Sequence, residues 1–128
     1  MKLNQKRVLI TGASSGIGYQ LALQMARQGA RLALVARSED KLQSLRQEIE
    51  KHHGIAIPMP TDISEAETIY QTVAQAASQL GGLDLVIANA GVGIVMPAHK
   101  MKPHHVDRML QVNLQGAIHT LLAGLQLM

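Results

Sequence analysis

The sequence has no cysteine, no tryptophan and no phenylalanine, and it has only two tyrosines. Without cysteine, these 128 residues can form no disulfide, no zinc–thiolate site and no cysteine nucleophile. Because bases bind by stacking on aromatic rings, the shortage of aromatics disfavours a site for single-stranded nucleic acid. The core must therefore be aliphatic, and the absence of cysteine fits a reducing cytoplasm, which is the expected location.

Long apolar runs and clustered charges are also missing. The net charge of +3 comes from lysines and arginines that are interleaved with acidic residues, which is typical of a solvated surface. Residues 1–7 are polar and precede too short an apolar run for a secretory signal. Residues 114–128 are too short to cross a membrane and are expected to form a buried helix. The six histidines show no ligand spacing. We expect no nucleic-acid partner, no membrane partner and no metal.

Two periodicities alternate along the chain. Short apolar runs that suit buried strands are followed by segments with helical spacing of apolar residues, which predicts βαβ units in one α/β domain. Strands are expected at residues 8–10, 32–36, 55–57 and 85–87. Helices are expected from Ile17, after a cap at Ser38, after a capping box at Ser64–Glu67, and from His105 onward.

Right-handed crossovers place these strands in the order 3-2-1-4, the first half of a doubly wound parallel sheet. Pro58 favours an edge position, or the end of a strand, for the third strand. The last helix has more apolar positions than one stripe, which predicts two covered faces. No further strands follow within the 128 residues, so one face of this helix and one edge of the fourth strand are expected to lack a partner.

The first strand runs into a glycine-rich turn, Thr11-Gly12-Ala13-Ser14-Ser15-Gly16-Ile17-Gly18. A strand before and a helix after such a turn are the context in which backbone N–H groups approach a phosphate. Isolated glycines would favour a purely structural turn. The spacing Gly-x-x-x-Gly-x-Gly with its leading Thr, however, closely resembles the short-chain dehydrogenase/reductase family.

Three later motifs extend the resemblance over nearly the whole chain. Asn89-Ala90-Gly91 is similar to the family's Asn-Asn-Ala-Gly signature, with Ala88 replacing its first Asn. Asp62-Ile63 matches the pair that meets the adenine ring, and Val112-Asn113 matches the segment with the family's structural and catalytic Asn. The resemblance implies a Rossmann-type NAD(P)-binding domain over residues 1–128, incomplete at its C-terminus. It names Asn113 as catalytic, and as cofactor-binding Gly12, Ser14, Ser15, Gly16, Ile17, Gly18, Arg37, Asp62, Ile63, Asn89, Ala90, Gly91 and Val112.

Cofactor choice depends on the end of the second strand, where NAD enzymes place a carboxylate on the ribose hydroxyl. Ala36 occupies that place, and the next residue is Arg37, whose guanidinium can hold a 2′-phosphate. NADP is therefore expected ahead of NAD, although Arg37 alone could be a solvated cation. Ser15 argues the other way, because many NADP-dependent members carry a second basic residue there.

Catalysis in the family uses a Ser and a Tyr-x-x-x-Lys pair, and neither can be assigned here. Tyr19 and Tyr70 are followed four residues later by Leu23 and Ala74. The resemblance implies an NADP-dependent oxidoreductase that transfers hydride between nicotinamide and an alcohol or carbonyl substrate. It also implies a homo-oligomer in the complete enzyme. We expect this truncated or fragmentary chain to be inactive alone. The alternative is a non-catalytic dinucleotide-binding or interaction module.

Overall fold

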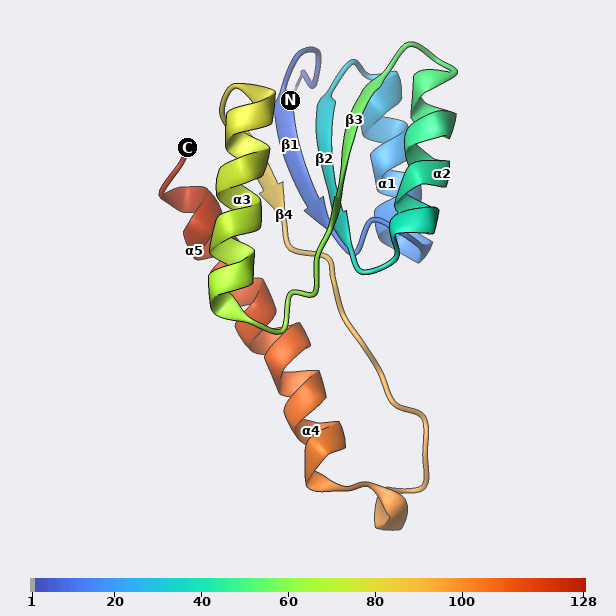
Figure 1. The fold of residues 1–128 in the computed structure, drawn as a ribbon. Coiled ribbons are helices and arrows are strands. Elements are labelled where there is room, and N and C mark those ends of the chain that lie inside the picture. The colour runs from blue at the N-terminus through green and yellow to red at the C-terminus, as the bar shows by residue number, and fades with distance from the viewer. Residues whose placement is uncertain (1) are drawn as a thin grey trace.

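A parallel sheet of four strands forms the centre of the computed structural model, which describes residues 2–128 (Figure 1). The strands lie in the order β3-β2-β1-β4, as predicted. They are β1 (Arg7–Thr11), β2 (Arg31–Ala36), β3 (Ile55–Pro60) and β4 (Leu85–Ile87). The helices are α1 (Gly16–Arg27), α2 (Glu39–Glu50), α3 (Ala66–Leu80), α4 (Pro103–Leu110) and α5 (Ala117–Leu125), with a 3₁₀ turn, η1, at Ala98–Lys100 and a π-helical segment, η2, at Gln111–Gly116. This arrangement is the first half of a Rossmann-type fold.

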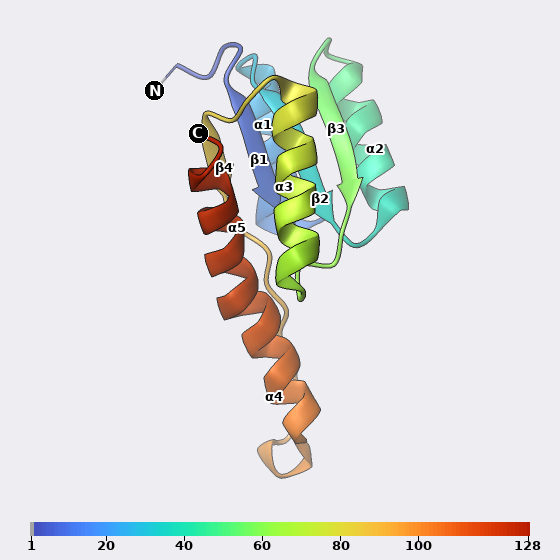
Figure 2. The same cartoon turned by 60° about the vertical axis from the view of Figure 1, so that its left-hand side comes forward.

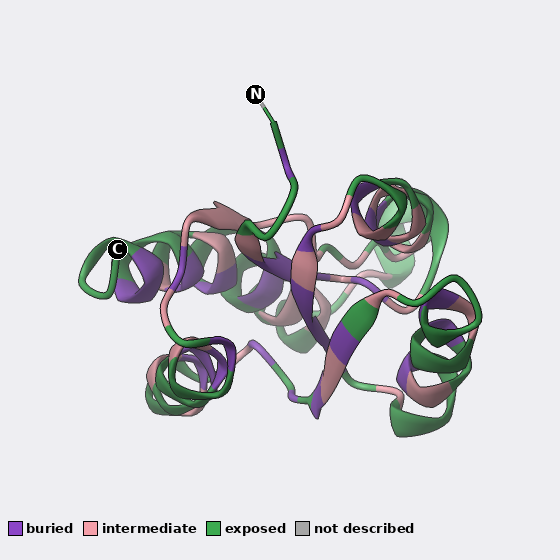
Figure 3. Ribbon diagram, turned by 90° about the horizontal axis from the view of Figure 1, so that it is seen from above, coloured by how far each residue is buried: buried purple, intermediate pink, exposed green. Residues whose placement is uncertain are grey.

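The two central strands are buried on both faces, which explains their unbroken apolar sequences. Leu9 pairs in register with Ala33 of β2 and Val86 of β4. Successive side chains of a strand point to opposite faces of the sheet. Val8 and Ile10 accordingly pack with α1 and α2, whereas Leu9 packs with α3 and α5. Helices α1 and α2 therefore cover one face of the sheet and α3 and α5 cover the other, whereas α4 extends beyond the sheet (Figure 2). The buried residues of the covering helices lie mainly on the sides that face the sheet (Figure 3).

The predicted helix starts are confirmed at α2 and wrong at α3. Ser38 caps α2, and its Oγ accepts a hydrogen bond of 3.4 Å from the backbone N–H of Lys41. The expected capping box at Ser64 does not form, because α3 begins at Ala66 and its N-cap, Glu65, makes no side-chain capping bond. The N–H of Ser64 instead donates to Oδ1 of Asp62 at 3.0 Å. The carboxylate closes a turn that places Ser64 outside the helix.

The last helical segment differs from the regular helix that was expected. It begins two residues before His105, at Pro103, and it is interrupted by η2. Thr120, Ala123 and Gly124 form the buried side of α5, whereas Leu114, Ile118, Leu121, Leu122 and Leu125 are exposed. One apolar face of the last helix is therefore covered within this chain, and the other is exposed, as expected for a face without a partner among these residues. No helix among residues 2–128 is long and apolar enough to span a membrane.

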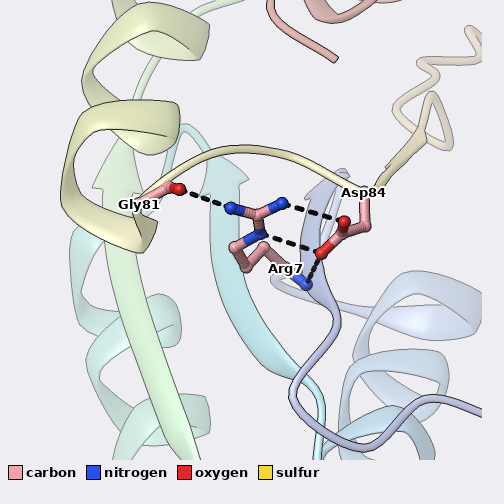
Figure 4. Close-up of polar contacts among 3 residues, drawn as sticks. All are labelled: Arg7, Gly81 and Asp84. Atoms are coloured by element: carbon pink, nitrogen blue, oxygen red, sulfur yellow. Dashed lines mark hydrogen bonds and ion pairs between the residues drawn. The ribbon is translucent and has the colours of Figure 1, made fainter.

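An ion pair closes the amino-terminal end of the sheet between β1 and β4 (Figure 4). The Arg7 Nε and backbone N–H each donate to Oδ2 of Asp84 at 2.8 Å, and a second guanidinium nitrogen donates to Oδ1 at 2.9 Å. The remaining guanidinium nitrogen donates to the carbonyl of Gly81. Side-chain and backbone hydrogen bonds from Arg7 hold the pKa of Asp84 well below its usual range. This pair anchors β4, which has only three residues.

Candidate functional site

A pocket of about 320 Å³ lies at the carboxyl end of the sheet, where ligands bind in open parallel sheets. Segments that follow all four strands contribute to its wall. The predicted site residues that line it are Gly12, Ser14, Ser15, Ile17, Arg37, Asp62, Ile63, Asn89, Ala90, Gly91 and Val112. Gly16, Gly18 and Asn113 are not part of the lining. The fold therefore brings together residues that are up to 100 positions apart in the sequence.

The glycine turn packs directly against the segment that follows β4. Gly12 has a φ of +67°, and a Cβ placed there would lie 2.8 Å from the Cα of Ala90. A Cβ on Gly18 would overlap the carbonyl oxygen of Gly12. Gly16 has a φ of +57°, but a Cβ there would meet no atom within 4 Å. Gly12 and Gly18 thus permit close packing within the protein, whereas Gly16 satisfies a backbone conformation and faces open space.

Thr11 clasps the ends of β1 and β4, although it was not among the predicted site residues. Its Oγ1 accepts hydrogen bonds from the backbone N–H groups of Asn89 at 3.0 Å and Ala90 at 3.1 Å. The Asn89 amide nitrogen donates back to the carbonyls of Thr11 at 3.2 Å and Gly12 at 3.3 Å. In the sequence, the threonine that ends an otherwise aliphatic strand could have indicated this role. The clasp fixes the turn against the Asn89 segment that forms the opposite wall.

Asp62 is held by Arg108, which lines the pocket and was not among the predicted site residues. A terminal guanidinium nitrogen of Arg108 lies 3.3 Å from Oδ1 and 3.2 Å from Oδ2 of Asp62. Burial acts to raise the pKa of Asp62, but hydrogen bonds from Ser64 and Arg108 outweigh it and lower the pKa. The carboxylate therefore stays ionised at neutral pH. Because 46 positions separate the pair, no local pattern indicated it.

Arg37 follows β2 directly and presents an exposed guanidinium at the pocket. Among residues 2–128 it forms no ion pair. The one acidic residue that lines the pocket is Asp62, which is engaged by Arg108. Arg37 is thus a cation free to meet an anionic ligand.

Asn113 lies in the π-helical segment beside the pocket wall. Its Oδ1 accepts a hydrogen bond from the N–H of Val92 at 2.7 Å, and its Nδ2 donates to the Val92 carbonyl at 2.8 Å. The side chain thereby fixes the backbone after Gly91, while its neighbour Val112 lines the pocket. Both amide atoms are used in this contact, so the side chain acts here as a positioning group. A part in proton relay stays a prediction.

Known proteins that resemble this chain in sequence belong to a family of dehydrogenases. The model of the family described as short chain dehydrogenase matches residues 6–128. The chain belongs to the short-chain dehydrogenase family. It is 40% identical over 114 residues to a glucose 1-dehydrogenase of Gluconobacter oxydans, an alignment that covers 88% of this chain and 43% of that protein.

Solved structures of the family superpose closely on this chain. A short chain dehydrogenase from Burkholderia cenocepacia in complex with NADP matches with a TM-score of 0.95 and 29% identity, covering 100% of this chain and 53% of the other. An NAD⁺-bound xylitol dehydrogenase matches with a TM-score of 0.92 and 29% identity, covering 100% and 50%. The chain thus spans about half the length of these relatives, and one of the two structures holds NADP and the other NAD⁺.

Proposed function

We propose that the protein binds NADP(H) in this pocket. We further propose that it is the cofactor-binding part of an oxidoreductase that acts on alcohol or carbonyl substrates. One observation carries the proposal. The pocket lies at the carboxyl ends of the strands, with the glycine turn on one wall and Arg37 and Asp62 on others. Open parallel sheets bind dinucleotides at this edge. When bound, the nicotinamide would accept or donate the hydride.

The turn has the electrostatic character that a pyrophosphate requires. The first turn of α1 contains no acidic residue, and the positive end of the helix dipole favours an anion there. In this proposal the backbone from Gly12 to Ile17 holds the pyrophosphate. Asp62 and Ile63 hold the adenine, while Asn89 and its neighbours line the opposite wall along the rest of the dinucleotide.

NADP is preferred over NAD in this proposal because Arg37, and no carboxylate, follows Ala36. A guanidinium can bind a phosphate through two parallel hydrogen bonds. Titration of NADPH and NADH should show tighter NADPH binding in the parent protein. Arg37→Ala should weaken NADPH binding by about 1.5 to 3 kcal/mol and leave NADH nearly unchanged.

The matched control is Arg27→Ala, since Arg27 is an exposed cation that does not line the pocket. It should change the affinity for neither dinucleotide. Equal affinities of the parent for NADPH and NADH would contradict the assignment of NADP. Equal losses for both ligands in Arg37→Ala would also contradict it.

The acid–base chemistry is proposed to belong to a part of the enzyme that these 128 residues do not contain. Neither Tyr19 nor Tyr70 lines the pocket, and Tyr70 packs edge-on against His119 with ring centroids 5.9 Å apart. The 128 residues alone should show no NADPH oxidation with a panel of carbonyl compounds, because a positioned acid contributes about 10²- to 10⁴-fold. Turnover that Tyr19→Phe or Tyr70→Phe abolishes would contradict this assignment.

A non-catalytic dinucleotide-binding module is the second candidate, favoured by the absence of Tyr-x-x-x-Lys from the sequence. Two observations distinguish the enzyme from the non-catalytic module. They are the gene sequence downstream of these residues and the turnover of the longest natural chain that contains them. Assembly of the whole enzyme as a homo-oligomer is part of the first proposal. Its test is the mass of that longest chain in solution.

A further inference from the structure

A second cavity opens beside Arg37 and has a different character from the main pocket. It has a volume of about 370 Å³ and is lined by Ser14, Ser15, Arg37, Ser38 and Lys41. The first three also line the main pocket, so the two spaces adjoin. The second cavity adds a hydroxyl and an ammonium group to the guanidinium, and no acidic side chain lines it. Its wall is suited to an anion.

Lys41 occupies an unusual place for a cation. It lies in the first turn of α2, where the positive end of the helix dipole disfavours a positive charge. The Ser38 cap fixes this turn through its bond to the Lys41 N–H. Glu39 and Asp40 precede Lys41 but do not line the cavity. The Lys41 ammonium forms no ion pair with any of residues 2–128. An anion in the cavity would offset the repulsion between Lys41, Arg37 and the helix end.

We propose that Lys41 is the second cation for a phosphate monoester in this cavity, the 2′-phosphate of NADP(H). The inference rests on the proposed function and deepens it. Arg37 would bind two phosphate oxygens through its planar fork, and Lys41 would contribute a point charge from the first turn of α2.

The test compares two nucleotides that differ only by the 2′-phosphate. Binding of 2′,5′-ADP and 5′-AMP to the protein is measured by isothermal titration calorimetry for the parent and for Lys41→Gln. Lys41→Gln should weaken 2′,5′-ADP binding by about tenfold, the size of one charge-assisted contact, and change 5′-AMP binding less than twofold. Lys41→Arg should retain most of the affinity for 2′,5′-ADP.

Lys51→Gln is the matched control, because Lys51 follows the other end of α2 and pairs with Glu48 at 3.1 Å. It removes the same charge and should change neither affinity. The Lys41-dependent part of the affinity should also fall as the pH drops from 7.5 to 5. The second pKa of a phosphate monoester is about 6, so the ligand loses one negative charge in that range.

Four outcomes would overturn the inference. An equal loss for both nucleotides in Lys41→Gln would show a general effect on the turn, and no loss for either would show a solvated side chain. Equal affinity of the parent for both nucleotides would remove the phosphate subsite while leaving dinucleotide binding intact. If the parent binds neither nucleotide nor NADH, the proposed function fails together with the inference.

Discussion

The strands β1 and β4 are tied together at both ends, but by different chemistry. At the amino end Arg7 and Asp84 form a charged pair in which every guanidinium nitrogen has a partner within the protein (Figure 4). At the carboxyl end Thr11 and Asn89 join the two strands through hydrogen bonds between neutral groups. The amino end is a closed structural joint. The carboxyl end joins the strands and leaves the pocket between the loops open.

The difference follows from what each joint leaves unpaired. In the charged joint Arg7 and Asp84 neutralise each other. The neutral joint leaves the positive end of α1 and the cation Arg37 at the pocket, with no acidic residue in the first turn of α1 and no ion pair at Arg37 among residues 2–128. A binding site for an anion requires this imbalance. At the carboxyl end, fixed strand ends thus occur together with an unpaired cation that lines a pocket.

The largest expected effect comes from overfilling the carboxyl joint. Gly18→Ala places a Cβ against the carbonyl oxygen of Gly12 and the Asn89 amide, so the turn must move away from β4. We expect the free energy of unfolding to fall by about 3 kcal/mol, measured by urea denaturation. Gly16→Ala is the control. Its Cβ has open space, so only the positive φ counts against it, at about 1 kcal/mol.

A larger substitution at Gly16 separates binding from folding. Gly16→Val should abolish dinucleotide binding while helix content by circular dichroism stays close to that of the parent, because Gly16 begins α1 between Ser15 and Ile17, two residues that line the pocket where the pyrophosphate is proposed to bind. Retained affinity in the folded variant would show that the turn is only structural.

Removing the hydroxyl of the neutral joint comes next in size. Thr11→Val keeps the shape of the side chain but leaves the N–H of Ala90 without the acceptor it has in the parent. We expect a loss of about 1 to 2 kcal/mol in the free energy of unfolding, with weaker dinucleotide binding. Thr11→Ser retains the hydroxyl and should recover the binding. A variant with unchanged stability would mean that water replaces the hydroxyl and that the clasp is unnecessary.

The same comparison explains how much could be predicted from the sequence. Apolar runs and helical spacing predicted the strands and helices, because buried strands and amphipathic helices carry local patterns, and the rule of right-handed crossovers then predicted the strand order. The turn from Gly12 to Gly18 and the Asn89 segment were predicted as parts of one site because both motifs resemble those of the family. The joints were not predicted, since Arg7 and Asp84 are separated by 77 positions and Thr11 and Asn89 by 78.

Two departures from prediction involve contacts that a local pattern does not encode. Ser64 has the spacing of a capping box, but its N–H donates to Asp62 and Ser64 lies outside the helix. There a side chain competes with regular helix geometry for a backbone partner, and local propensity does not reveal the outcome. The π-helical segment contains Asn113, whose side chain binds the backbone of Val92, 21 positions away in the sequence.

The contribution of the Arg7–Asp84 pair to the free energy of unfolding should decrease at acid pH. The folded state holds the pKa of Asp84 far below the unfolded value of about 4, so the pair stabilises the fold above that pH. This stability is lost as the pH falls below about 4. Asp84→Asn should therefore be less stable than the parent at pH 7, and the difference should shrink between pH 4 and pH 2. Asp107→Asn, at a carboxylate with no ion pair among residues 2–128, should show no such convergence.

The smallest effect is expected at the pair of Arg108 and Asp62, which brings charge to the carboxyl end. The Asp62 side chain is 49% exposed, against 25% for Asp84, and the contacts of 3.2 to 3.3 Å are longer than those of Arg7. Solvent therefore screens this pair, and Arg108→Gln should cost less than about 1 kcal/mol of stability. The pKa of Asp62, followed by carboxyl NMR, should rise toward its ordinary value, and 1 M salt should reduce the difference between parent and variant. If Arg108→Gln destabilises the fold as much as Thr11→Val does, the carboxyl end also depends on charge and the contrast between the two joints is lost.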